Sequence, residues 1–97
     1  MIKRQFRTEE EFTSFFFGED AEKEYIYDNI VDAIEIAMFE NLETAAFAEI
    51  MIAGEILDIK CERNEFSMNL QNALTYYIDN EIFEKCKRIQ DLINEHD

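Results

Sequence analysis

Acidic side chains are the residues of this sequence whose type and spacing come closest to a chemical site. Glu24, Asp28 and Asp32 recur at every fourth position, so on a helix each stands one turn above the last. Carboxylates placed in this way can hold a metal ion or raise one another's pKa. No histidine or second motif accompanies them. We therefore interpret the row as a solvated helix face and expect no metal site and no cofactor.

The other residue types used in catalysis are sparse. The single histidine, His96, is the penultimate residue, where a chain end frays, and no nucleophile, phosphate-loop or dinucleotide motif occurs. Cys61 and Cys86 lack the C-x-x-C spacing of a zinc site, and each falls on an apolar stripe. We expect both cysteines to be reduced and structural. We also expect no catalytic residues and a protein that is not an enzyme.

The net charge of −14 narrows the range of partners. The chain carries 23 Asp and Glu against nine Lys and Arg, and the excess lies between residues 8 and 59. Nucleic acid and anionic membranes bind basic surfaces, so we expect direct binding to neither. No apolar run reaches the roughly 18–20 residues of a membrane span, and the N-terminus lacks the apolar stretch of a secretion signal. These observations predict a cytoplasmic protein.

The pattern of apolar and polar residues predicts a short helix over residues 8–17. Thr8 and Glu11 have the spacing of a capping box, in which each side chain accepts a hydrogen bond from the other residue's backbone N–H. Gly18 is of a residue type that commonly ends helices. Three consecutive phenylalanines close this segment and cannot all face one core, so we expect Phe17 to be partly exposed.

Residues 20–40 carry the clearest helical pattern. Apolar residues recur there at three- and four-residue steps, and acidic residues fill the positions between them. Asp20 is suited to cap the start of this helix, and Asn41 is suited to end it. The segment is therefore expected to present one apolar stripe to the core and one acidic face to solvent.

Residues 44–63 fit two different structures. Ala, Glu and Met are plentiful in the first half of the segment, which favours a helix. In the second half, Leu57, Ile59 and Cys61 alternate with charged residues, which is the period of a half-buried strand. We predict a β-hairpin that turns at Ala53-Gly54, with a continuous helix as the alternative.

Residues 65–95 form two apolar stripes separated by a polar break at residues 79–81, which fits one bent helix or a tight helical hairpin. Within residues 68–94 the chain reads MNLQNAL from Met68, EIFEKC from Glu81 and IQDLI from Ile89. This pattern resembles the UVR-type helical hairpin of bacterial excision-repair subunits. The resemblance implies a hairpin that docks on another protein. Cys86 and Lys87 stand where that family prefers two alanines.

Together these elements predict a single α+β domain over residues 1–97, with a short helix, a long helix, a β-hairpin and a C-terminal helical segment. An all-α bundle is the alternative. A lone hairpin is marginal in water, so it needs the helices against one face or a second copy of itself. An edge strand at residues 57–61 is suited to form such a homodimer about a two-fold axis.

Two surfaces are candidates for binding a protein partner. The first is the acidic face of the long helix, whose carboxylates repeat at each turn and approximate the charge density of a duplex. Its residues are Asp20, Glu24, Asp28, Asp32 and Glu35. Four of them, Glu24, Asp28, Asp32 and Glu35, lie off the apolar stripe, so we expect the fold to remain intact when they are changed to Gln or Asn. The second surface is aromatic and consists of Phe12, Phe16 and Phe17.

These features predict a small acidic protein-interaction module, an inhibitor or adaptor that docks on a larger complex. DNA mimicry would direct it to a complex that binds nucleic acid. In size and charge the chain resembles small acidic inhibitor proteins of phage and mobile elements. The alternative is a structural or assembly component that acts as a homo-oligomer.

Overall fold

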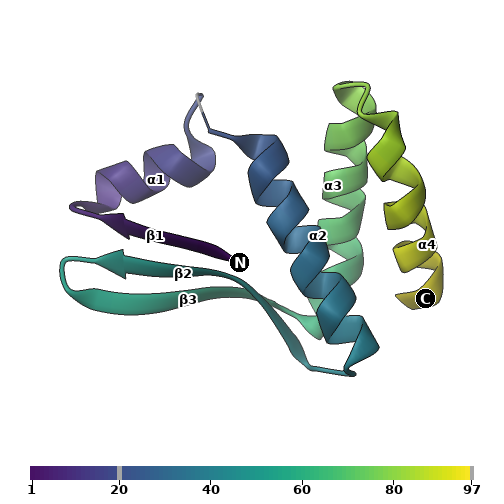
Figure 1. Cartoon of the computed structure of the whole chain (residues 1–97), viewed down its shortest axis with the longest axis horizontal. Helices are drawn as coiled ribbons and strands as arrows, with labels where there is room; N and C mark the ends of the chain where they lie inside the picture. Colours follow the sequence, from purple (N-terminus) through teal and green to yellow (C-terminus); the bar gives the residue numbers. More distant parts are fainter. Residues whose placement is uncertain (20, 97) are drawn as a thin grey trace.

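The computed structural model describes residues 1–19 and 21–96. Within those residues the chain forms three strands, four α-helices and two short 3-10 helices (Figure 1). Their order is β1 (Ile2–Phe6), α1 (Glu9–Phe17), α2 (Lys23–Phe39), β2 (Thr44–Ile52), β3 (Glu55–Glu62), η1 (Arg63–Glu65), α3 (Phe66–Asp79), η2 (Phe83–Lys85) and α4 (Cys86–His96). The predicted α+β class is confirmed, and the all-α alternative is wrong.

The three strands form one sheet in the order β1-β2-β3. β1 runs parallel to β2, with Ile2 opposite Ala48 and Phe6 opposite Ile52, and β3 returns antiparallel to β2. The sequence does not predict β1, because charged residues hide the alternation of Ile2 and Phe6. The strand forms because β2 supplies backbone partners that so short a segment lacks by itself.

The predicted β-hairpin is confirmed, and the continuous helix is wrong. Ala53 and Gly54 form its two-residue turn with φ values of 51° and 84°, the left-handed geometry that matches the twist of paired strands. β2 begins at Thr44 and contains a bulge between Ala46 and Ala48. Pairing of β2 on both sides outweighs the helix propensity of its alanine-rich sequence.

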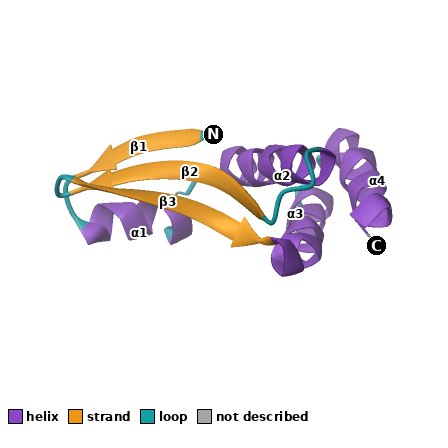
Figure 2. Ribbon diagram, turned by 90° about the horizontal axis from the view of Figure 1, so that it is seen from below, coloured by secondary structure: helices purple, strands orange, loops and turns teal. Residues whose placement is uncertain are grey.

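The helices cover one face of this sheet (Figure 2). On that face Ile2, Ala48 and Ile50 are fully buried in the core that the sheet shares with the helices. On the other face Lys3 and Asp58 flank Glu49 in a row across the three strands, and all three are exposed. The molecule is consequently thin, with extents of 40 × 31 × 17 Å.

Burial along β3 departs from the prediction at one position. Cys61 is buried and Ile59 is half-buried, as the alternation predicts, but Leu57 is 43% exposed. Leu57 is the third residue of β3, and the end of the strand next to the hairpin turn lies away from α2 and α3 (Figure 1). The strand therefore extends past the helices that bury its other end.

The start and end of α1 follow the sequence signals with two changes. The Thr8 hydroxyl accepts the backbone N–H of Glu11 at 3.2 Å, as predicted, but the Glu11 carboxylate accepts the N–H of Arg7 rather than that of Thr8. Gly18 ends the helix with a φ of −71°, outside the left-handed region. A Cβ at Gly18 would lie 2.5 Å from the carbonyl oxygen of Ser14, so close approach of the backbone requires glycine there.

The long helix α2 begins at Lys23, later than predicted, and Asp20 lies outside the described residues. Its end at Asn41 is confirmed. Asn41 has a φ of 57°, and the next N–H, of Leu42, donates to the carbonyl of Ala37 at 2.8 Å. This is the Schellman arrangement, in which a left-handed residue closes the helix.

The C-terminal segment is a helical hairpin rather than one bent helix, because α4 folds back beside α3 (Figure 1). α3 ends in a second Schellman arrangement, with Glu81 at a φ of 57° and the N–H of Ile82 donating to the carbonyl of Tyr77 at 2.8 Å. A left-handed backbone is unfavourable for glutamate, since its Cβ crowds the adjacent carbonyl. The turn between the two helices therefore contains a residue that is poorly suited to its conformation.

Replacing that residue provides a test of the turn. Glu81→Gly is expected to raise the free energy of unfolding by about 0.5–1 kcal/mol, because glycine adopts the left-handed conformation without the Cβ conflict. Urea denaturation followed by circular dichroism measures the change. Asp79→Gly, two positions earlier inside α3, is the control and is expected to lower stability by a similar amount. A loss of stability in both variants would contradict the assigned turn.

Candidate interaction surfaces

The acidic face of α2 contacts the α3–α4 hairpin. Nζ of Lys85 lies 2.6 Å from Oε2 of Glu24 and 2.9 Å from Oδ2 of Asp28. The hydrogen bonds to Asp28 and Glu24 raise the pKa of Lys85 above its usual value. The first two carboxylates of the predicted row therefore share one cation.

Arg88 binds Asp32, the last residue of that row, and also Glu35, and we call these four residues (Glu24, Asp28, Asp32 and Glu35) the α2 acidic row. The Nη2 atom of Arg88 lies 2.8 Å from Oδ1 of Asp32 and 2.8 Å from Oε1 of Glu35. Hydrogen bonding to these acids, chiefly to Glu35, raises the pKa of the guanidinium group. Lys85 is the last residue of η2 and Arg88 lies in the first turn of α4, so together they fasten η2 and the start of α4 to α2.

Asp28 also accepts a hydrogen bond from a core residue. The Tyr77 hydroxyl donates to Oδ1 of Asp28 at 2.5 Å, and the Tyr77 side chain is almost completely buried. Burial raises the pKa of Tyr77 well above its usual range, and the hydrogen bond to Asp28 adds to this effect. Asp28 is half-buried and is a structural acceptor for the core. The sequence pattern, which places Asp28 on a solvated helix face, does not predict this contact with the core.

Four residues of the predicted acidic surface are thus brought together, and half of their negative charge is compensated. Its fifth residue, Asp20, lies outside the described residues. Glu24, Asp28, Asp32 and Glu35 lie in one row on α2 as predicted, and the two cations reduce their four negative charges to a net −2. All four side chains are tied into contacts within the chain. A row of carboxylates that is half neutralised is less suited to mimic a phosphate backbone than the sequence pattern implies.

The predicted aromatic surface divides into two parts. Phe12 and Phe16 are half-buried in a cluster with Phe6 and Phe15, whose neighbouring ring centroids are 4.9–5.8 Å apart. This cluster packs α1 against β1. Phe17 is 78% exposed, as expected, so it is the one of the three predicted phenylalanines that is free to contact a partner.

A groove of about 560 Å³ lies where the last turns of α2 and α4 meet η1. Phe39 on its rim is 91% exposed and Ile36 is 56% exposed, although both are large apolar side chains. We call this feature the Phe39 groove. Its lining consists of apolar Ile36, Met38, Phe39 and Leu92, acidic Glu35, Glu40 and Glu95, and the basic or titratable side chains Arg63 and His96.

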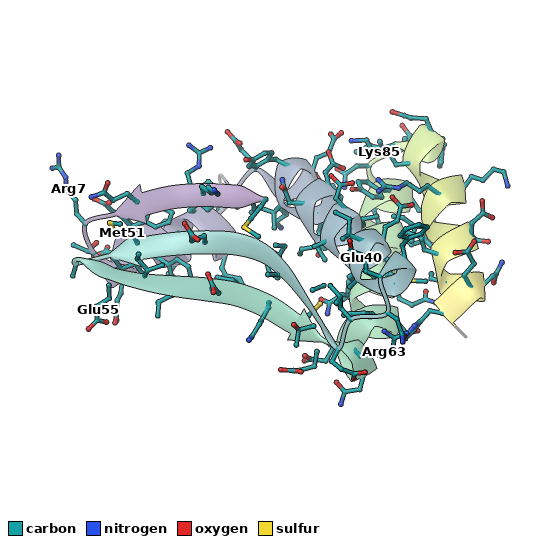
Figure 3. All side chains as sticks on the ribbon, turned by 60° about the horizontal axis from the view of Figure 1, so that its bottom comes forward. Arg7, Glu40, Met51, Glu55, Arg63 and Lys85 are labelled. Atoms are coloured by element: carbon teal, nitrogen blue, oxygen red, sulfur yellow. The ribbon has the colours of Figure 1, made fainter. Side chains whose placement is uncertain are left out.

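The Phe39 groove is electronegative for two reasons. First, α2 and α4 run in the same direction and both end there (Figure 1), and the carbonyl end of a helix carries partial negative charge. The last turn of α2 has no basic residue that would offset this partial negative charge. Second, Glu40 and Glu95 add two full negative charges, against the single positive charge of Arg63 on the same lining. Figure 3 shows Glu40 and Arg63 at this end of the molecule.

Reasoning from the sequence does not identify this groove. Ile36 and Phe39 lie among the recurring apolar residues of α2, so in the sequence pattern they resemble core residues. One signal was available, because the last turn of α2 has apolar residues at positions 36–39 and a single stripe facing the core cannot bury them all. Which of them remain exposed depends on how the other elements pack against α2.

Both cysteines are free thiols. Cys61 is buried, and its burial, with a smaller contribution from the charge of Glu65, raises the pKa of the thiol to about 11. Cys86 is half-buried, and its Sγ atom lies 3.7 Å from the carbonyl oxygen of Ile82. The structure thus confirms a buried thiol at Cys61 and places Cys86 at the margin of the core.

Over residues 1–19 and 21–96, no three His, Cys, Asp or Glu side chains gather closely enough to hold a metal ion. In the same part of the chain, no helix combines the length and apolar composition needed to cross a bilayer. Comparisons of the chain with protein-family models, curated proteins and solved structures returned no match. A function can therefore be inferred only from the geometry and charge of this molecule.

Proposed function

We propose that this protein is a small acidic interaction module, an inhibitor or adaptor that docks on a larger protein complex through the Phe39 groove. The observation that carries the proposal is the 91% exposed side chain of Phe39 beside a depression lined by apolar and charged residues. Binding hot spots are enriched in aromatic residues that insert next to pockets and are surrounded by polar residues. The groove combines these properties in one place.

The residues that line the groove indicate which kind of surface a partner would present to it. Its apolar lining residues favour an aliphatic or aromatic side chain, and its acidic residues and two helix ends favour lysine or arginine beside that side chain. The net charge of −14 would also accelerate encounter with a basic surface. A nucleic-acid-binding subunit exposes a surface of this kind, so complexes of that class fall within the proposal.

The partner is expected to bind at the groove rather than on the α2 acidic row. Lys85 and Arg88 occupy that row, and displacing them would break the contacts that fasten α4 to α2. The groove needs no such rearrangement. DNA mimicry by α2 is therefore the less favoured mode of binding.

The test is affinity capture from a lysate of the protein's own cells with three tagged baits. These are the unmodified chain, Phe39→Ser and Phe83→Ser, where Phe83 is another exposed phenylalanine, in η2. We expect one partner to bind the unmodified chain and the Phe83 variant equally. The Phe39 variant is expected to bind it at least about 30-fold more weakly, the effect of losing a hot-spot residue of about 2 kcal/mol.

A salt series on the same baits tests the electrostatic part of the proposal. Binding is expected to weaken between about 0.1 and 0.5 M salt, because exposed charges are screened over that range. Equal capture of the partner by the Phe39 and Phe83 variants would refute the groove as the docking site. Finding no partner that discriminates between them would refute the proposed function.

A further inference from the structure

The outer edge of β3 is the longest unpaired strand edge in the described part of the chain. β3 spans Glu55–Glu62 and pairs with β2 on one side only, whereas the other edge strand, β1, is shorter. Figure 3 shows β3 as the outermost strand along that side of the sheet. The sheet bulge between Ala46 and Ala48 lies in β2, so β3 has neither a proline nor a bulge, and of the features that commonly block edge pairing it carries only charged side chains.

Three apolar side chains of this edge are at least partly exposed to solvent. Ile56 is 63% exposed on one face of the sheet, and Leu57 is 43% exposed on the other. Ile59 is only half-buried. A strand placed beside β3 would cover all three, so the edge gains apolar burial as well as backbone hydrogen bonds from pairing.

The charged residues of β3 determine in which register a second copy of the strand can pair with it. When two copies of β3 pair antiparallel about a two-fold axis, residues directly opposite share a face, and only two registers use most of the strand. In one of them Asp58 faces Asp58 of the second copy, which is unfavourable. In the other Ile59 faces Ile59 of the second copy, and Asp58 faces Lys60 of the second copy twice by symmetry. The strand is thus complementary to itself in one register.

We propose that two copies of this chain form a homodimer by antiparallel pairing of their β3 strands, with Asp58 of each copy opposite Lys60 of the other. The pairing continues the sheet from one copy into the next and places Leu57 beside Cys61 of the second copy. Four charges of alternating sign then meet on the outer face. This surface is separate from the Phe39 groove, so the dimer does not depend on the proposed function.

Charge reversal at the two-fold axis tests the dimer. Sedimentation equilibrium is measured on the unmodified chain at up to about 500 µM, on Asp58→Lys, on Lys60→Asp, and on the double variant that exchanges the two charges. Each single reversal replaces two opposite-charge contacts with two like-charge contacts. It is expected to raise the dimer dissociation constant about 10- to 100-fold, and the double variant is expected to restore it.

Lys3→Glu is the matched control, since Lys3 lies on the same face of the sheet but on β1, the other edge strand, and its reversal is expected to leave the dimer unchanged. Circular dichroism establishes that each variant is folded. Amide hydrogen exchange provides a second readout, with protection of β3 that rises with the concentration of the unmodified chain. A monomer at the highest concentration, dimers that survive the single reversals, or a double variant that stays monomeric would each overturn the proposal.

Discussion

Asp28→Ala is expected to lower the free energy of unfolding by about 2–3 kcal/mol, more than replacement of any other acid in the α2 row. The variant leaves the buried Tyr77 hydroxyl without its acceptor and removes one of the two acids that bind Lys85. A buried donor that loses its partner bears the full cost of desolvation, whereas an exposed ion pair contributes little. Urea denaturation at pH 7 measures the change.

Three further variants separate these contributions. Asp28→Asn keeps an oxygen that can accept the Tyr77 hydroxyl and loses only the charge, so a cost of about 1 kcal/mol or less is expected. Glu35→Ala removes an acid that binds Arg88 at the surface and is expected to cost about 0.2–1 kcal/mol. A double-mutant cycle with Tyr77→Phe gives the coupling directly. If Asp28→Ala proves no more harmful than Glu35→Ala, the hydrogen bond to Tyr77 is not a stabilising contact.

Stability is expected to fall steeply in alkaline solution. The Cys61 thiol has a pKa of about 11 in the folded chain against an ordinary value near 9, so between these pH values the unfolded chain releases a proton that the folded chain retains. The contribution of Cys61 is fully present below pH 9 and is lost as the pH rises to 11, a decrease of about 2–3 kcal/mol. Tyr77, whose pKa is also raised, adds a similar slope above pH 10.

Two variants assign this pH dependence to its groups. Urea denaturation in the presence of reductant is measured at half-unit steps from pH 8 to about 11. Cys61→Ala is expected to flatten the decline between pH 9 and 10, and Tyr77→Phe is expected to flatten it above pH 10. Cys86→Ala is the control for loss of a thiol. A slope that is unchanged between pH 9 and 10 in Cys61→Ala would show that this thiol is not protected from ionisation by burial.

The elements that could be predicted from the sequence are those specified by neighbouring residues. Thr8 caps α1, Asn41 closes α2 and Ala53-Gly54 forms the hairpin turn, because each acts on backbone groups within a few residues of itself. β1 could not be predicted in the same way. Its partner strand is β2, far along the chain, and its own alternation is masked by charged residues.

The candidate binding surfaces could likewise be predicted only in part. The periodicity of α2 placed Glu24 and Asp28 correctly on one face, but it carries no information about which element packs against that face. Their partner Lys85 comes from a distant segment, and only the return of α4 along α2 brings the groups together. The exposure of Phe39 is likewise a property of the tertiary structure, because it depends on which elements pack against the last turn of α2.

The parallel pairing of β1 has a consequence for the order in which the chain folds. The β2–β3 hairpin closes through a two-residue turn, whereas Ile2 meets Ala48 only after α1 and α2 have crossed over between them. Closing the longer loop costs more chain entropy, so β1 is expected to dock last. Until it does, the β2 edge is open to the first strand of any neighbouring chain. Refolding at high concentration is therefore expected to yield some molecules that have exchanged their N-terminal strands.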